Sequence, residues 1–301
     1  MRRVLLENTI TLLGPDLLSK EAGLVKEFRA LAGRMGIQLG WHYLLDLAWI
    51  GRELGDPKGA RILDAGAGTG SLQWWLAEKG AQVISVDRQD RSDLSFRFRM
   101  AYKVQGLREV DLLTPGQMIA RRLQHDPGGI GSRSMAAVRA ALGGMLSRTR
   151  SKAPGEVIMY NHDLAPLQDL PDEHADAVVS VSALEHNDPE NLQPVVDELM
   201  RVLKPGGMLL ATMAASPDRD WFHAPSQGWC LTSSSLRDAF GLPSRSEDDF
   251  TDFASVLEDL RACKELEDGL APFHFESGEN GMPWGKWDPQ YVPVGIKVYK
   301  A

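Results

Sequence analysis

A glycine-rich turn is the strongest chemical signal in the sequence. Between a short apolar run and a helical pattern stand the residues Asp64-Ala65-Gly66-Ala67-Gly68-Thr69-Gly70. Glycine adopts backbone conformations closed to other residues and lets a ligand approach the backbone closely. A turn placed before a helix also offers amide N–H groups to a nucleotide-like group or a carboxylate. The turn therefore predicts a cofactor site.

The spacing of the glycines discriminates between cofactors. A dinucleotide fingerprint, G-x-G-x-x-G, would place its third glycine at position 71. The sequence has Ser71 there, and the third glycine comes one residue earlier, at Gly70. The Gly-Lys-Ser/Thr of a Walker A loop is missing from the turn as well. The pattern thus disfavours phosphoryl and hydride transfer, and a dehydrogenase remains as the formal alternative.

The elements around this turn predict an α/β protein. Hydrophobic runs predict strands, and apolar residues at helical spacing predict helices between them. Strands are expected at Arg61–Ala65, Gln82–Asp87, Glu156–Tyr160, Ala177–Ser182, Met208–Met213 and Tyr291–Lys300, and helices at Lys20–Leu31, 39–54, Ser71–Glu78 and Pro194–Leu203. Alternating strands and helices are typical of a doubly wound, mostly parallel sheet with helices on both faces.

Two segments depart from a plain alternation. The first sixty residues are expected to be helical, which predicts an N-terminal helical cap over residues 1–58. From Asp87 to Val157 the chain runs 70 residues, about 45 more than one helix and two short loops need. We expect a helical insertion within the domain over residues 91–153, including an amphipathic helix over 132–150. The prediction is one domain, 1–301.

Five motifs in order resemble class I S-adenosylmethionine-dependent methyltransferases, which have a Rossmann-like fold. They are Ile62–Gly70, Val83–Asp87, Asn161–Leu164, Leu170–His186 and Glu198–Gly207. The resemblance covers residues 59–214 and continues through the last strand. It implies a seven-stranded sheet, S-adenosyl-L-methionine as cofactor, and methyl transfer to an acceptor.

The resemblance also implies roles for single residues. Asp64 would bind the amino end of the cofactor, and Asp87 its ribose hydroxyls, because a carboxylate can accept two hydrogen bonds from a cis diol. At the position of the adenine contact, Asp163 is the first choice, with His162 or Asn161 as alternatives if the strand is shifted by one residue. The complete set of expected cofactor-binding residues is Asp64, Gly66, Ala67, Gly68, Gly70, Asp87, Arg88, His162, Asp163, Leu164 and Ser182.

Two histidines are candidates for catalysis. His186 follows the fourth predicted strand, and His223 follows the fifth, where substrate loops commonly lie. A neutral imidazole near the methyl group could remove a proton from an acceptor hydroxyl or amine, although the family resemblance implies that the position of His186 is often structural or orienting. Glu185-His186-Asn187-Asp188 offers metal ligands, but no second cluster completes a site, so no metal is expected.

Aromatic residues gather in two further places. Trp41, His42 and Tyr43 belong to an N-terminal helix that either closes over the cofactor or packs on the sheet. A C-terminal group walls an apolar or sugar-binding pocket or packs around the last strands; its members are Trp221, Trp229, Trp284, Trp287 and Tyr291.

The charge balance limits the partners. The chain has 33 basic and 41 acidic residues, a formal net charge of −8, which argues against broad nucleic-acid binding. Residues 91–152 nevertheless carry +8, so an acidic acceptor, an anionic lipid surface or an oligomer contact remains open there. Two cysteines are too few for a disulfide scaffold and favour the cytoplasm.

The motifs and the charge together lead to one principal function and two alternatives. The leading hypothesis is methyl transfer to an oxygen or nitrogen of a small-molecule or glycan-like acceptor. The first alternative is that the same fold methylates a membrane lipid or macromolecule held by the basic insertion. The second is that the chain is a non-catalytic cofactor-binding module. No apolar run reaches the length of a membrane span, so a soluble protein is expected.

Overall fold

A central sheet of ten strands organises the computed structural model, which describes residues 7–125, 153–243, 249–270 and 286–301. Eight strands follow the order β1-β10-β7-β6-β2-β3-β5-β4, and β9 joins the sheet by pairing with β7 and β8. The strands are β1 (Thr9–Leu12), β2 (Arg61–Ala65), β3 (Gln82–Asp87), β4 (Lys103–Gly106), β5 (Glu156–Asn161), β6 (Ala175–Val181), β7 (Leu203–Ala215), β8 (Trp221–His223), β9 (Gly228–Leu231) and β10 (Val292–Tyr299).

The middle of the sheet is parallel. Strand β2 pairs in parallel with β3 and β6, β3 with β5, and β6 with β7. Strand β10 is antiparallel to β7, and β1 is antiparallel to β10. The chain therefore has the mostly parallel, Rossmann-like α/β fold that the sequence predicts, and the carboxyl ends of β2, β3, β5 and β6 meet at one edge.

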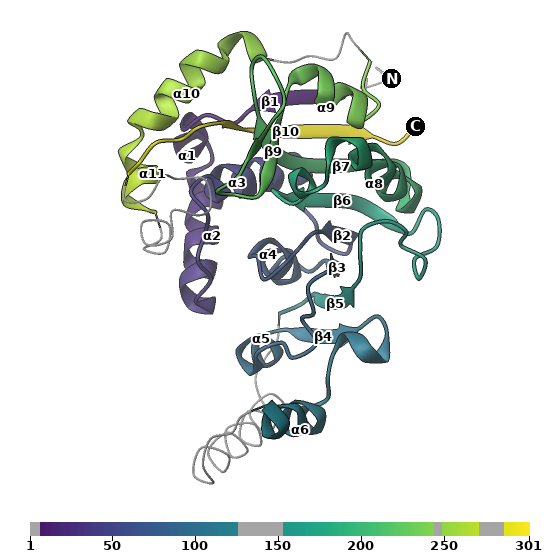
Figure 1. Cartoon of the computed structure of the whole chain (residues 1–301). Coiled ribbons are helices and arrows are strands. Elements are labelled where there is room, and N and C mark those ends of the chain that lie inside the picture. Colours follow the sequence, from purple (N-terminus) through teal and green to yellow (C-terminus); the bar gives the residue numbers. More distant parts are fainter. Residues whose placement is uncertain (1–6, 126–152, 244–248, 271–285) are drawn as a thin grey trace.

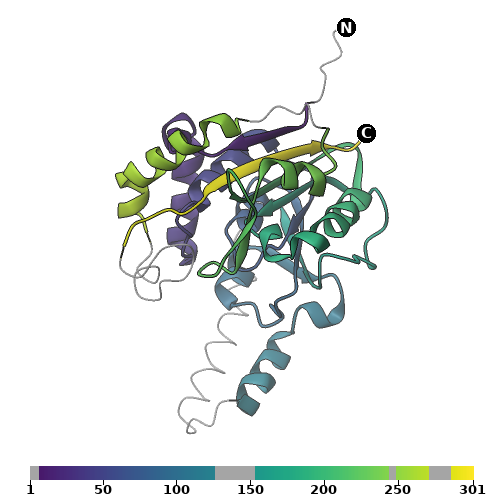
Figure 2. The same cartoon turned by 45° about the horizontal axis from the view of Figure 1, so that its top comes forward.

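The expected count of seven strands is wrong, because the described sheet has ten. Strand β1 lies in the N-terminal segment that was expected to be helical, and it runs beside β10 (Figure 1 and Figure 2). Strand β4 lies in the segment expected to be a helical insertion and forms the opposite edge, pairing with β5. Strands of three or four residues carry too short a pattern for detection, and partners far away in sequence stabilise them.

The helices cover both faces of the sheet. Helices α3 and α4 lie on one side and α8 on the other, while α5 and α6 extend below the sheet near β4 (Figure 1). The helices are α1 (Asp16–Lys20), α2 (Ala22–Met35), α3 (Tyr43–Leu54), α4 (Leu72–Glu78), α5 (Phe96–Ala101), α6 (Pro115–His125), α8 (Pro189–Val202), α9 (Ser233–Ala239), α10 (Phe253–Ala262) and α11 (Lys264–Asp268). The helix expected over 132–150 lies outside the described residues.

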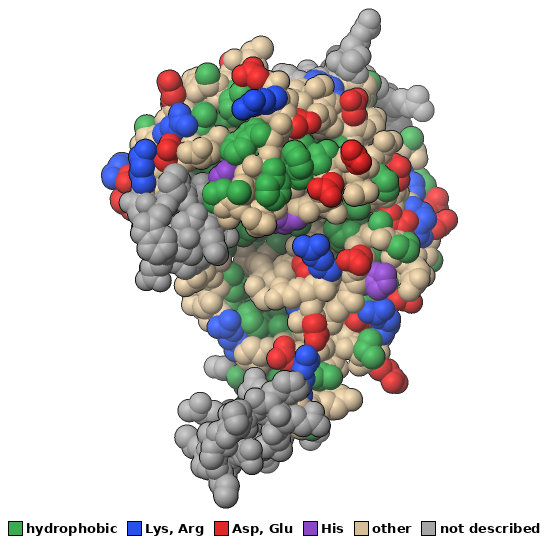
Figure 3. Space-filling view, viewed as in Figure 1, with side chains coloured by type: hydrophobic (Ala, Val, Ile, Leu, Met, Phe, Trp, Pro, Cys, Tyr) green, Lys and Arg blue, Asp and Glu red, His purple; other side chains and the backbone are tan. Residues whose placement is uncertain are grey.

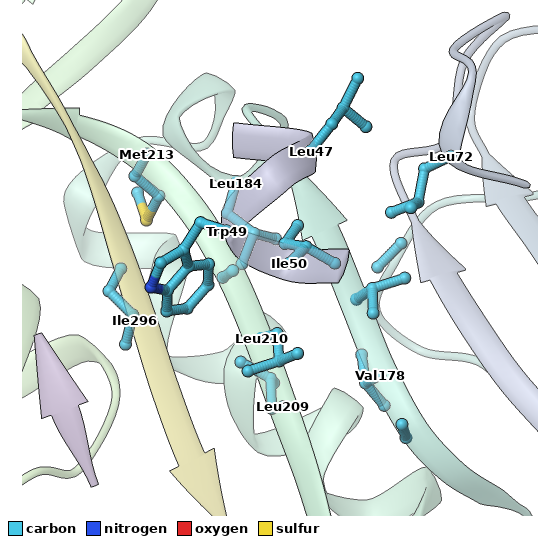
Figure 4. Packing of buried hydrophobic residues seen from close by; sticks show 14 of the residues in the cluster. Leu47, Trp49, Ile50, Leu72, Val178, Leu184, Leu209, Leu210, Met213 and Ile296 are labelled. Carbon is cyan, nitrogen blue, oxygen red and sulfur yellow. The ribbon is translucent and has the colours of Figure 1, made fainter. Parts of the chain in front are cut away.

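Helix α3 is held against the sheet by close packing at one glycine. Trp49 of α3 is 1% exposed and lies against β7 and β10, near Met213 and Ile296 (Figure 4). Its indole occupies the space beside Gly295 of β10, where an added Cβ would lie 2.5 Å from Trp49 Cε2. The N-terminal segment is thus fixed on the sheet, and its first turn reaches the edge where the parallel strands end.

Candidate active site

A cavity of about 800 Å³ opens at the carboxyl edge of the parallel strands. Its walls come from the segments that follow β2, β3, β5 and β6, together with α8 and the start of α3. The face shown in Figure 3 is hollowed near its middle, with hydrophobic side chains gathered above the hollow. The predicted site residues that line the cavity are Asp64, Gly66, Ala67, Gly68, Gly70, Asp87, Arg88, Asp163, Leu164, Ser182 and His186.

The backbone of the glycine-rich turn is folded as its residue types require. Gly66 and Gly68 have φ angles of 73° and 49°, a region that residues with a Cβ rarely adopt. A Cβ at Gly66 would also overlap the methyl group of Ala183, which follows β6. The amides of Gly66 and Ala67 donate to the carbonyl of Val86 at 2.9 and 3.0 Å. The turn is therefore seated on the end of β3.

A buried polar group beneath the turn was not predicted from the sequence. Gln73 Nε2 lies 3.2 to 3.4 Å from the carbonyl oxygens of Ala67, Gly68 and Gly70, and Gln73 Oε1 accepts from Ser85 Oγ at 2.7 Å. Arg91 donates to Ser85 Oγ at 2.7 Å and to the carbonyl of Gly68 at 3.1 Å. These bonds hold three turn carbonyls on the inner side.

Arg91 is therefore a structural residue and not part of an exposed basic surface. It is 4% exposed, and it also donates to the carbonyl of Ser85 at 2.8 Å. Burial lowers the pKa of its guanidinium, while the carboxylates of Asp87 and Asp64 raise it. The sequence signal was weak, since one arginine four residues after Asp87 looks like any other member of the basic stretch.

Asp64 lies below the turn at the floor of the cavity, 2% exposed. Burial raises the pKa of its carboxyl to about 7, and the positive charge of Arg91 opposes that rise. A carboxyl group with this pKa gains from a positively charged ligand group, because the cation stabilises its ionised form. The position fits the amino end of an amino-acid-bearing cofactor.

Asp87 ends β3 and holds two backbone amides. Its Oδ2 accepts from Gly68 N at 2.7 Å, and its Oδ1 accepts from Gln89 N at 2.8 Å. A carboxylate oxygen has more than one acceptor position, so the group can still receive hydrogen bonds from a diol in the cavity. Asp87 thus joins the turn after β2 to the segment after β3.

At the next strand the structure separates the alternatives for the adenine contact. Asp163 and Leu164 line the cavity, and His162 and Asn161 are not among its lining residues. The ring of His162 stacks on Tyr160 with centroids 5.0 Å apart. Asn161 Nδ2 donates to the carbonyl of Asp111 at 3.0 Å. Asp163 and Leu164 therefore remain the candidates.

His186 lines the opposite wall in a defined orientation. Its Nδ1 lies 2.9 Å from the carbonyl oxygen of Gln227. A carbonyl can only accept, so Nδ1 carries the hydrogen, and in the neutral imidazole Nε2 holds the lone pair. The ring is exposed and can meet a ligand in the cavity. This is the arrangement that a general base needs.

His223 and the aromatic group lie elsewhere. His223 is 3% exposed, and its Nδ1 lies 2.7 Å from Ser226 Oγ. Burial lowers its pKa. The described members of the C-terminal aromatic group, Trp221, Trp229, Trp287 and Tyr291, are not among the residues that line the cavity, and Trp284 lies outside the described residues.

The N-terminal segment contributes directly to the cavity. Ile37, Gln38, Leu39, Tyr43 and Leu47 line it, whereas Trp41 and His42 are buried behind this wall. Of the two roles considered for this segment, the lining residues support closure over a ligand, and the buried pair supports packing. Both therefore occur in the same segment.

Within the described ranges, no group of three or more His, Cys, Asp or Glu side chains could hold a metal ion. None of the helices in those ranges is long and apolar enough to cross a membrane.

Comparisons with known proteins agree with the motifs. The family model described as Methyltransferase domain matches residues 141–211, which confirms the resemblance to the methyltransferase family. A ribosomal RNA small subunit methyltransferase C of Chromohalobacter salexigens is 59% identical over 34 residues, which is 11% of this chain and 10% of that protein. A ubiquinone biosynthesis O-methyltransferase of Leptothrix cholodnii is 42% identical over 48 residues, 16% of this chain and 20% of that protein.

One of the solved structures that are similar to this chain is a methyltransferase at low sequence identity. It is a 1,6-didemethyltoxoflavin-N1-methyltransferase of Burkholderia thailandensis with bound 1,6-didemethyltoxoflavin and S-adenosylhomocysteine, 14% identical, with a TM-score of 0.41. The alignment covers 95% of this chain and 86% of that chain. The chain spans at most a fifth of the length of the two curated relatives.

Proposed function

We propose that the protein is an S-adenosyl-L-methionine-dependent methyltransferase that acts on an oxygen or nitrogen of a small-molecule or glycan-like acceptor. The observation that carries the proposal is the convergence of Asp64, the glycine-rich turn, Asp87, Asp163 and His186 on one cavity. The residues fit the cofactor, since a buried carboxyl at Asp64 suits its amino group and the strand-terminal carboxylate of Asp87 suits its ribose diol, while the glycines of the turn let the ligand approach the backbone closely. The relatives' names support the same class of reaction.

The chain's own residues have three tasks in this reaction. When bound, the cofactor supplies an activated methyl group, so the protein needs little covalent chemistry. The walls around the cavity hold the acceptor in line and exclude water, which contributes most of the acceleration. His186 Nε2 is placed to take the proton from an acceptor hydroxyl or amine.

Three further assignments belong to the same proposal. Residues 1–301 form one methyltransferase domain, in which residues 1–58 are a cap and residues 91–153 an insertion. The protein acts in the cytoplasm.

Arg91 and Arg99 donate to backbone carbonyls, and Arg108 and Arg121 pair with Asp111 and Asp90. These four charges are engaged within the fold, which supports a small acceptor over a polyanion or an anionic lipid surface; five other basic residues of the stretch, Arg133, Arg139, Arg148, Arg150 and Lys152, lie outside the described residues.

Calorimetric titration tests cofactor binding. The wild-type protein should bind both S-adenosylmethionine and S-adenosylhomocysteine, and NAD should give no heat of binding. Formation of S-adenosylhomocysteine with a panel of alcohols, phenols, amines and sugars then identifies the acceptor class. Donor binding without methyl consumption on every acceptor would favour the non-catalytic module, and binding of NAD alone would favour a dehydrogenase.

His186→Ala tests the base on the acceptor so identified. Loss of general-base catalysis should reduce kcat by about 10²–10⁴, while the Kd for S-adenosylmethionine stays within about twofold because the ring is not assigned to the cofactor. His162→Ala is the matched control, since that ring stacks on Tyr160 outside the cavity lining. Wild-type turnover by His186→Ala would remove this residue as the base.

A further inference from the structure

A buried acidic pair stands behind one wall of the cavity. Asp46 of α3 is 0% exposed and Glu185, which follows β6, is 6% exposed. Asp46 Oδ1 and Glu185 Oε2 are both buried without a hydrogen-bond partner among the residues that the structure describes. Buried polar atoms are normally paired, and buried carboxylates almost always are. Two such oxygens in one region therefore require an explanation.

The pair is connected to the cavity through Ser182. The Ser182 hydroxyl donates to Asp46 Oδ2 at 3.1 Å, and Ser182 lines the cavity with its backbone held at a φ of 43°. Because its hydrogen is donated to Asp46, the hydroxyl can act toward other groups only as an acceptor. Burial raises the pKa of Tyr43, another lining residue, and the negative charges of Glu185 and Asp46 raise it further.

The hydrogen bonds around Asp46 make its carboxyl oxygen an acceptor. His42 Nδ1 lies 2.8 Å from Asp46 Oδ2, and His42 Nε2 lies 3.2 Å from the hydroxyl of Tyr291. The Tyr291 oxygen accepts from Trp41 Nε1 at 3.2 Å, so its own hydrogen can be donated to His42 Nε2. In this arrangement His42 Nδ1 carries a hydrogen, so Asp46 Oδ2 accepts from both His42 and Ser182.

The proposed cofactor contacts indicate which part of the cofactor would lie at the cavity wall in front of Asp46 and Glu185. Along the edge the strands follow the order β5, β3, β2, β6, so Asp87 and the glycine-rich turn occupy the middle. With the ribose of the cofactor at Asp87 and its amino-acid part at the turn, the sulfonium would lie between them. Its methyl group would then face the part of the cavity lining that neither contact occupies. Tyr43, Ser182 and His186 are among the residues that line the cavity apart from the turn and Asp87.

We propose that the cavity end formed by Tyr43 and Ser182 is a subsite for an organic onium group, where the buried carboxylate of Asp46, and that of Glu185 once it ionises, favour the charged methyl donor over its neutral thioether product. The inference rests on the proposed function and adds to it a means of product release. Transfer of the methyl group removes the positive charge from sulfur, and the attraction between this wall and the ligand is lost in the same step.

The test is the ratio of two dissociation constants. Calorimetry with S-adenosylmethionine and S-adenosylhomocysteine on wild-type protein and on Asp46→Asn gives Kd for the charged and the neutral ligand. At pH 7 the substitution should raise the Kd of the charged ligand about tenfold relative to that of the neutral ligand, as expected for the loss of one nearby charge. Asp259→Asn, an exposed residue on α10, is the matched control.

Glu185 allows a second experiment, because its carboxyl ionises in a pH range where ligand binding can be measured. Burial raises its pKa to about 8. The groups around it are His42, Tyr43 and Asp46 beside or on α3, Cys230 on β9, Tyr291 immediately before β10, and Ser182. Glu185→Gln should therefore change the ratio little at pH 7 and severalfold at pH 9. Glu258→Gln, adjacent to the first control on α10, serves as its match.

The outcomes separate the inference from the proposed function. An equal loss of affinity for both ligands in Asp46→Asn would show a merely structural role, and an unchanged ratio would show no role; either result overturns the inference and leaves the methyltransferase proposal standing. Failure of the wild-type protein to bind either ligand would instead overturn the proposed function.

Discussion

Asp87 illustrates how one side chain serves both the fold and the site. Its two oxygens accept from Gly68 N and Gln89 N, so the same carboxylate that is proposed to hold the ribose also fixes the segments on either side of it. A glycine-rich turn whose amides are fixed before the ligand arrives loses less conformational entropy on binding.

Replacement of Asp87 by alanine should therefore weaken cofactor binding in two ways, by removing the contact to the ribose and by loosening the glycine-rich turn. The loss of two charge-assisted hydrogen bonds and of the loop order should raise the Kd for S-adenosylhomocysteine by about 10²-fold or more, measured by calorimetry. Asp238→Asn, at an exposed position on α9, should leave the Kd unchanged. An Asp87→Ala protein that binds as tightly as wild type would exclude the ribose contact.

Glu185 should also set part of the pH dependence of stability. Its pKa of about 8 in the folded state lies above the value of 4.5 for a solvated glutamate, so between these values the folded protein binds more protons than the unfolded chain. Stability then falls as the pH rises from about 4.5 to 8. Asp64, with a pKa of about 7, acts in the same direction.

Glu185→Gln should flatten this dependence. Urea unfolding between pH 5 and pH 9 should show that the wild-type protein loses roughly 2–4 kcal/mol more than the variant over that range. Glu258→Gln should follow the wild-type curve. Parallel curves for wild type and Glu185→Gln would mean that this carboxyl has an ordinary pKa in the folded protein.

At the scale of elements, α3 connects the core to the cavity. Trp49 lies against β7 and β10 (Figure 4), while Tyr43 and Leu47 of the same helix line the cavity. The glycine opposite the indole, Gly295, makes this packing possible. A change far from the cavity can thus shift the helix that forms its wall.

Gly295→Ala tests this connection. The added methyl group meets the indole, and overpacking of this kind costs about 1–3 kcal/mol, measurable as a lower midpoint of urea unfolding. Gly23→Ala makes the same chemical change in α2, where an added Cβ meets no atom within 4 Å, and should stabilise the helix by about 0.5–1 kcal/mol. Equal effects of the two substitutions would contradict the packing argument.

At the scale of the whole molecule, the first strand completes the sheet from the opposite end of the chain. Thr9–Leu12 pairs with Val294–Lys297 of β10, and Ile10 and Leu12 are buried. The N-terminal segment therefore contributes an edge strand as well as helices. The chain closes its sheet by a contact between residues almost 290 positions apart.

Deletion of residues 1–12 should lower the stability of the fold without affecting ligand binding. Two buried apolar side chains and four paired residues are lost, which should cost about 3–5 kcal/mol and reduce the Tm in a thermal melt. The affinity for S-adenosylhomocysteine should stay within about twofold, since the cavity lies at the other strands. A deletion of residues 1–6, which leaves β1 in place, is the control.

Local pattern was sufficient for the parts that depend on near neighbours in sequence. Strands β2 and β3 begin and end where the sequence predicts, and the turn between Asp64 and Gly70 has the positive φ angles that its glycines indicate. Eleven of the thirteen predicted site residues line one cavity, because carboxyl ends of parallel strands meet at one edge. His162 and His223 were placed near the site by position alone, which does not give side-chain direction.

The sequence by itself determined the fold class, the order of the motifs and the residues of the glycine-rich turn. Only the tertiary structure decided which buried groups stand behind the cavity, such as Arg91 under the turn and Asp46 behind Ser182. The reason is physical: hydrophobic period and turn chemistry act over a few residues, whereas burial and pairing of a charge depend on atoms brought together from distant segments.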